Sequence, residues 1–166
     1  MKKILFKGGF TLMESLVVIA IIGILTTIVM ANFTTAKSKA RDGKRISDIA
    51  QLQLALAQIF DRCNQYPEST TGGNTLLLTS SANGGCRSMS DFISVIPKDP
   101  FSNSYVYVTN NGNTDYVLRA KLENYNSALL DDTDNTHIPL GITVTDGCDE
   151  GASNSSGPFY YCVQPK

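Results

Sequence analysis

The sequence lacks the motifs that mark the common enzyme classes. It has no G-x-S-x-G nucleophile elbow, no Walker phosphate-binding loop and no H-E-x-x-H zinc motif. His137 is the only histidine, and no neighbouring residue completes a nucleophilic or metal-binding set with it. We therefore expect a protein that is not an enzyme.

Closely spaced cysteine pairs are also missing. The four cysteines form no C-x-x-C motif, so structural zinc is not expected: Cys63, Cys86, Cys148 and Cys162. An even cysteine count behind an export signal favours two disulfides. Of the three pairings, Cys63–Cys86 and Cys148–Cys162 are favoured because both close short local loops. Free buried thiols are the alternative.

The chain has little net charge, formally −1, and no broad basic face. A nucleic acid is therefore not an expected partner. The charge is unevenly placed, however, because Lys37–Arg45 holds five basic residues against Asp42. This stretch is interpreted either as a solvated helix face, or as a contact with lipid headgroups or with acidic surfaces of a neighbouring chain.

Proline is absent before Pro67, so no proline interrupts a helix in this part of the chain. From Ile46 onward, apolar residues recur with the spacing of one helix face. The pattern predicts one helix from about Phe10 to Asp61, apolar in its first half and amphipathic in its second. Its polar side is expected to hold Ser47, Asp48, Gln51, Gln58 and Asp61.

One long apolar run is present. Ser15–Phe33 carries no charge, and a run of about 20 apolar residues suffices to span a bilayer. A secretory signal is cleaved after its apolar region, but here the small residues Gly8 and Gly9 precede the run. A cut after Gly9 would retain the apolar helix and make Phe10 the new N-terminus.

Glu14 lies near the start of this span, where a carboxylate is costly unless it has a partner. Within one chain it weakly favours the helix N-terminal dipole. A stronger partner is the α-amine of Phe10 on a neighbouring chain, which would give the chain a physical reason to assemble. The alternative is a plain single-pass anchor with an incidental glutamate.

Residues 7–25, K-G-G-F-T-L-M-E-S-L-V-V-I-A-I-I-G-I-L, resemble the class III signal of type IV prepilins and type II secretion pseudopilins. The resemblance implies that a prepilin peptidase cuts between Gly9 and Phe10 and N-methylates Phe10. It implies that Glu14 registers the incoming subunit against Phe10 of its neighbour. It also implies a homo-oligomeric helical filament, built on an inner-membrane assembly platform.

The same resemblance implies the topology. The chain would cross the inner membrane once, in contact with lipid, with its N-terminus cytoplasmic and its C-terminal domain outside. It would then enter an extracytoplasmic filament or pilus. We divide the chain into a leader peptide (1–9), a transmembrane and filament-core helix (10–33), an amphipathic continuation of the helix (34–65) and a C-terminal globular β-sheet region (66–166).

The globular region contains strand patterns. Alternating runs at Tyr105–Thr109 and Asp115–Lys121, separated by N-N-G-N, predict a β-hairpin. Ile138–Thr145 and Phe159–Val163 are candidates for further strands. A long N-terminal helix packed against a small antiparallel sheet is an α+β arrangement, here pilin-like.

A second resemblance lies in this region. K-D-P-F-x-N-x-Y-x-Y at 98–107, followed by Y-V-L-R-A-K-L-E at 116–123, resembles the major pseudopilin of type II secretion and related pilins. In that pseudopilin a loop after the sheet binds Ca²⁺. The nearest candidate here has the oxygen ligands that Ca²⁺ prefers: Asp131, Asp132, Asp134 and Asn135. A solvated acidic turn is the alternative, and no other cofactor is expected.

Three functional hypotheses follow. The leading one is a structural subunit of a type IV pilus-like filament. The second is a pseudopilin of a type II protein secretion system, which shares the cleavage and the polymerisation. The third is a monomeric membrane-anchored adhesin or receptor, for which Glu14 would be dispensable.

Overall fold

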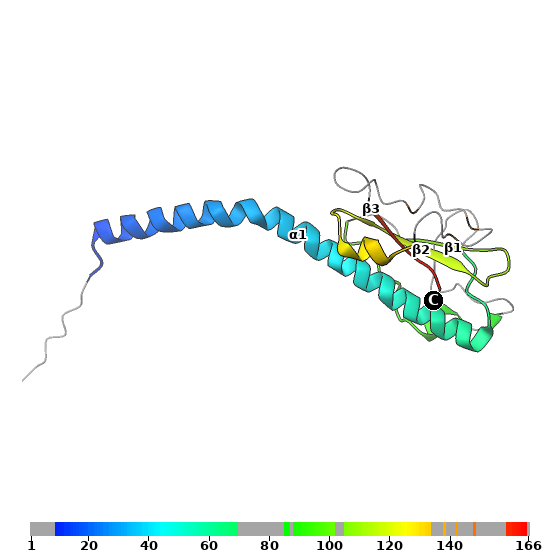
Figure 1. The fold of residues 1–166 in the computed structure, drawn as a ribbon. Coiled ribbons are helices and arrows are strands. Elements are labelled where there is room, and N and C mark those ends of the chain that lie inside the picture. The colour runs from blue at the N-terminus through cyan, green and yellow to red at the C-terminus, as the bar shows by residue number, and fades with distance from the viewer. Residues whose placement is uncertain are drawn as a thin grey trace, which may run out of the picture. The chain divides into compact units, whose positions relative to one another are not determined.

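The computed structural model describes residues 9–69, 85–86, 88–101, 105–133, 138, 142, 148 and 159–165, with the backbone alone for residues 31, 32 and 131. One helix and three strands dominate the described part (Figure 1). Their bounds, with two short 3₁₀ helices, are α1 (Leu12–Cys63), η2 (Met89–Asp91), β1 (Val106–Thr109), β2 (Tyr116–Leu122), η3 (Ser127–Asp131) and β3 (Phe159–Val163). The predicted α+β, pilin-like fold is confirmed.

Both ends of α1 have a local cause. At the start, the hydroxyl of Thr11 accepts the backbone N–H of Glu14 at 3.2 Å, which satisfies one unpaired helix donor. At the end, Asn64 adopts a left-handed conformation (φ 53°) and donates its N–H to the carbonyl of Phe60. Pro67 then prevents the helix from resuming. The observed end lies within two residues of the predicted one.

The three strands form one antiparallel sheet in the order β1-β2-β3. Val108 pairs with Val117 across the hairpin, and Arg119 pairs with Cys162. The predicted hairpin and the predicted C-terminal strand are therefore confirmed. Within the candidate strand at 138–145, only Ile138 and Ile142 are described, and neither lies in a strand. The rest of that range lies outside the described residues.

The chain divides into two compact units, Met1–Lys37 and Ser38–Lys166. Within the second unit, one face of the sheet shares a hydrophobic core with the amphipathic part of α1. Burying one leucine or isoleucine side chain contributes about 1.5–3 kcal/mol, so this core holds helix and sheet together. Its fully buried members include Ile49, Leu52, Leu56, Ile59, Tyr107 and Leu118.

The opposite face of the sheet is also covered. Val108 and Val117 pack with Ile142 and with the disulfide of Cys148 and Cys162. As a result, β2 is buried on both faces at all positions except one. A second disulfide, Cys63–Cys86, ties the last residue of α1 to a segment 23 positions later in the chain. These are the two pairings that the short loops favour.

Candidate functional site

The first candidate site is the apolar half of α1. Leu12–Met30 has a mean hydropathy of 2.5 over 19 residues, and none of it is buried. By length and composition it can cross a membrane. Leu16, Ile19 and Ile24 are each more than 60% exposed. A continuous apolar surface of this size is typical of a segment that contacts lipid or other protein.

The predicted processing and assembly residues lie together at the start of this helix. Gly9 has open space around its Cα, and the Phe10 side chain is 80% exposed. Glu14 is exposed in the first turn, where its negative charge favours the helix dipole. The peptide bond between Gly9 and Phe10 thus precedes the cap at Thr11. The roles of these residues in cleavage, methylation and assembly stay predictions.

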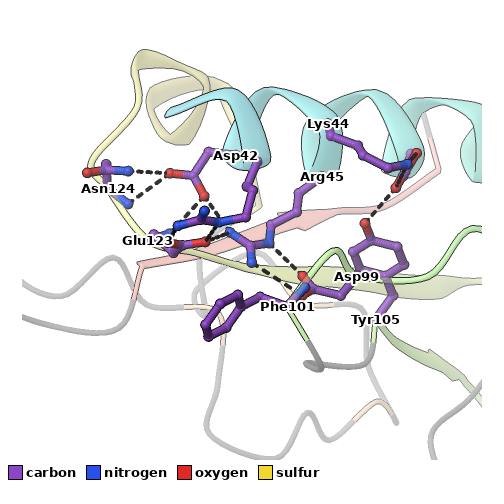
Figure 2. A network of polar contacts seen from close by, with 10 residues as sticks. Asp42, Lys44, Arg45, Asp99, Phe101, Tyr105, Glu123 and Asn124 are labelled. Atoms are coloured by element: carbon purple, nitrogen blue, oxygen red, sulfur yellow. Dashed lines mark hydrogen bonds and ion pairs between the residues drawn. The ribbon is translucent and has the colours of Figure 1, made fainter. Parts of the chain in front are cut away.

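The second candidate site is a buried charge cluster in the unit Ser38–Lys166, centred on Arg45 (Figure 2). The Arg45 side chain is completely buried. Its Nε and Nη2 donate to the two oxygens of Asp99, at 2.5 and 3.2 Å. Its Nη1 donates to Asp42 and Glu123, both at 2.7 Å. One guanidinium therefore joins α1 to two segments that are far away in sequence.

Asp42 extends this connection to the backbone. Its carboxylate accepts the N–H groups of Glu123 and Asn124, both at 2.9 Å, and the Asn124 amide at 2.8 Å. Asp42 is 1% exposed, so each of these bonds shields a charge that would otherwise be costly to bury. The turn that follows β2 is thereby attached to α1.

Glu123 lies between two arginines. Arg41 holds its carboxylate through two hydrogen bonds, and Arg45 adds a third. The bonds from Arg41, followed by those from Arg45, lower the pKa of Glu123 to about 2. Burial disfavours the Arg45 cation, but hydrogen bonds to Asp99, Glu123 and Asp42 prevail and raise its pKa. Both partners therefore stay ionised over the physiological pH range.

A fourth carboxylate, Asp48, continues the cluster one turn along the helix from Arg45. Asp48 accepts the hydroxyl of Tyr105 at 2.8 Å and the ammonium of Lys44 at 3.1 Å. Burial, and next the bond to Asp48, raise the pKa of Tyr105, so this tyrosine stays a donor. The segment before β1 is thus also attached to α1.

These contacts correct two expectations. The basic stretch Lys37–Arg45 is not a uniformly solvated face, because Arg45 and Asp42 are buried. Asp48, expected on the polar side, is 4% exposed. The physical reason is that carboxylates and tyrosine hydroxyls of the globular region satisfy these groups. The spacing indicates the burial but not the partners, since extending the buried stripe of Ile49 back by helical steps reaches Arg45 and Asp42.

The candidate Ca²⁺ ligands are only partly described. One oxygen of Asp132 accepts the N–H of Cys162 at 3.0 Å, and the N–H of Thr133 donates to the Cys162 carbonyl. Asp132 therefore positions the loop against β3. The side chain of Asp131, and all of Asp134 and Asn135, lie outside the described residues, as does His137. The Ca²⁺ site stays a prediction.

Two family models match different parts of the chain. The prokaryotic N-terminal methylation motif matches residues 6–30, and the model for type II secretion system (T2SS) protein G matches residues 32–121. The motif together with the α+β fold defines a pilin-like protein with an apolar N-terminal helix. The chain belongs to the type II secretion system protein G family, the major pseudopilins.

Curated relatives agree with this assignment. The chain is 36% identical over 111 residues to type II secretion system core protein G of Vibrio cholerae, covering 66% of this chain and 75% of the relative. It is 39% identical over 101 residues to the protein of the same name from Aeromonas hydrophila, covering 60% and 71%. It is 36% identical over 104 residues to the one from Escherichia coli K12, covering 61% and 72%.

These findings decide between the functional hypotheses. The family consists of structural pseudopilin subunits, so this protein is not an enzyme. The leading hypothesis, a type IV pilus subunit, gains no specific support. The second hypothesis, a pseudopilin, is the one that the family supports.

Proposed function

We propose that this protein is the major structural subunit of a periplasmic secretion pseudopilus. Its precursor is anchored in the inner membrane by Leu12–Met30, with the unit Ser38–Lys166 outside. A prepilin peptidase cuts between Gly9 and Phe10 and N-methylates Phe10. An assembly platform in the membrane then extracts the mature subunit into a helical filament, which promotes the export of folded proteins.

The observation that carries this proposal is the contrast between the exposed apolar helix and the buried polar cluster. The 19 residues Leu12–Met30 expose their apolar side chains to whatever surrounds them. Lipid can cover this surface in the precursor, and the same helices of other subunits can cover it in a filament. The match to the N-terminal methylation motif over residues 6–30 supports the processing step.

Glu14 supplies the proposed registry between subunits. A carboxylate within an apolar core is costly when it lacks a partner, and the nearest new cation is the α-amine that cleavage creates at Phe10. Pairing Glu14 of one subunit with Phe10 of the next would remove this cost. Cleavage would therefore be a chemical precondition for assembly.

The test deletes the gene in the producing bacterium and restores it as the wild type or as Gly9→Leu. We expect the deletion to abolish release of the exported proteins and the wild type to restore it. Gly9→Leu should leave the protein uncleaved in the membrane and fail to restore release. Gly43→Ala is the matched control, because Gly43 lies outside the apolar half of α1, is exposed and has open space around it, and it should restore release fully.

Two outcomes would contradict the proposal. Normal release of exported proteins in the deletion strain, with loss of extended surface filaments, would assign the protein to a pilus. Full restoration by an uncleaved Gly9→Leu protein would favour a monomeric anchored receptor.

A further inference from the structure

Exposed lysines gather at one end of the unit Ser38–Lys166. Lys39 lies on α1 just before the buried cluster, and Lys98 and Lys121 are also exposed. Lys98 precedes Asp99, and Lys121 lies two residues before Glu123. Asp99 and Glu123 both bind Arg45, so all three lysines lie at the end of the unit where α1 enters it. We call Lys39, Lys98 and Lys121 the basic end.

Carboxylates gather at the opposite end. Asp61 lies in the last turn of α1, and Glu68 follows Pro67 directly; both are exposed. Asp115 belongs to the β1–β2 turn, which Figure 1 shows beside the end of α1, and the N–H of Tyr66 binds this turn at the Asn113 carbonyl. We call Asp61, Glu68 and Asp115 the acidic end.

Among the described residues of this unit, Arg62 departs from the pattern. Arg62 lies beside Asp61, but its guanidinium stacks over the ring of Phe92, 5.9 Å from the ring centroid. Its charge is therefore directed towards η2, and the carboxylates of the acidic end outnumber it. The separation of sign is a property of the exposed groups, because the buried cluster contains both signs in mutual contact.

The two ends are too far apart to neutralise each other within one subunit. Lys39 and Asp61 are 22 positions apart on one helix, which is about 33 Å along its axis. The Debye length in physiological salt is about 8 Å. Within the described part of the chain, the ion pairs involve other residues, so the lysines of the basic end and the carboxylates Asp61 and Glu68 have no internal ion pair.

We propose that the basic end of one subunit binds the acidic end of a second copy of this chain, stacked next to it along the filament. This inference rests on the proposed assembly into a filament. A head-to-tail contact of unlike ends uses two different surfaces, so it does not stop at a dimer, and where its rotation does not close into a ring it produces an open helical polymer. The charges also select polarity, because two subunits in opposite directions would bring like ends together.

The experiment reverses each end in the full-length protein and measures the share of subunits in sedimentable filaments. The basic-end variant combines Lys98→Glu with Lys121→Glu, and the acidic-end variant combines Asp61→Lys with Glu68→Lys. We expect each to lower the filament share by about fivefold, the order expected when exposed pairs change from attraction to repulsion. The matched control is Ala50→Glu at an exposed position between the two ends, and it should leave the share unchanged.

The decisive variant carries all four substitutions. It exchanges the signs of the two ends, so unlike charges meet again, and we expect the filament share to recover to at least half of the wild-type value. Equal filament shares for the two single-end variants and the control would overturn the proposal, as would a fourfold variant no better than either.

N-terminal mass spectrometry of each sample separates this inference from the proposed function. If the wild type is cleaved at Phe10 and assembles, but reversal has no effect, only the electrostatic contact is wrong. If the wild type is neither cleaved nor assembled, the proposed function fails, and the contact fails with it.

Discussion

The two parts of α1 belong to one continuous helix but are stabilised by different surroundings. Leu12–Met30 carries no charge beyond Glu14 in its first turn, is otherwise mainly apolar and has no buried side chain. Beyond Ser38, the same helix buries an apolar stripe against the sheet and a charge cluster against two loops. The first part therefore needs a partner outside the subunit, whereas the second finds its partners within it.

The largest effect on assembly is expected from Glu14→Gln. Losing the carboxylate leaves the α-amine of the neighbouring Phe10 without its proposed partner in an apolar environment. We expect the filament share to fall more than tenfold, while the unfolding free energy of the globular unit stays unchanged. Sedimentation after shearing measures the first quantity and urea unfolding in detergent measures the second. Ser15→Ala is the control, and a filament share equal to that control would refute the role of Glu14.

Arg45→Met should have the opposite pattern, a loss of stability in the globular unit. The substitution leaves Asp42 and Asp99 buried without their main cation, which typically costs about 3–5 kcal/mol. Urea unfolding followed by near-ultraviolet circular dichroism would measure the loss. Lys39→Met is the matched control, because Lys39 is exposed and forms none of the ion pairs of the described residues, so it should change the unfolding free energy by about 0.5 kcal/mol or less. Similar losses for both variants would contradict the central position of Arg45.

The same leucine-to-alanine substitution should change the unfolding free energy differently in the two parts of the helix. Leu56 is fully buried, and Leu56→Ala should lower the unfolding free energy of the globular unit by about 2–5 kcal/mol. Leu16 is 64% exposed, and Leu16→Ala should leave that free energy unchanged. Urea unfolding of both variants in the same detergent measures the difference. A loss from Leu16→Ala as large as that from Leu56→Ala would show that the two parts are not separately stabilised.

The smallest expected effect is a dependence on pH. The pKa of Glu123 is lowered from 4.5 to about 2, so its ionisation stabilises the folded state above pH 4.5. This contribution should be lost as the pH falls from 4.5 towards 2. Arg41 and Arg45, which face Glu123, stay protonated throughout. Glu123 is partly exposed, so solvent screening keeps the effect modest.

Glu123→Gln isolates this contribution. The amide cannot ionise, so the urea midpoint of the variant should vary less between pH 4.5 and 2 than that of the wild type. Parallel pH profiles for the two proteins would mean that the pairing with Arg41 does not contribute to stability.

The sequence allowed the helix and the strands to be predicted because their signals are local. The absence of proline before Pro67 and the alternation around N-N-G-N depend on neighbouring residues alone. Each end of α1 lies two residues from its predicted position. At the C-terminal end, Asn64 forms a left-handed cap that the apolar spacing does not predict. The disulfide pairings followed from the short loops.

The charge cluster could not be predicted in the same way. Arg45 is buried because Asp99 and Glu123 reach it from segments 54 and 78 positions away. Helical periodicity shows charge and spacing but not such distant partners, so it leaves Lys37–Arg45 open to three interpretations: a solvated face, a contact with lipid headgroups, or a contact with acidic surfaces of a neighbouring chain. The motifs that contain Asp99 and Glu123 indicate a family resemblance. They do not indicate that these two carboxylates bind Arg45 and so attach their segments to α1.

The proposed function requires that the exposed apolar half of α1 is kept through processing and becomes the assembly element. Mass spectrometry of intact protein and N-terminal peptides, from membranes and from filament fractions, tests it most directly. We expect a mature chain that starts at N-methylated Phe10 and is four hydrogens lighter because of two disulfides. An intact leader in the filament fraction, or a cut beyond Met30 that removes the apolar helix, would contradict it.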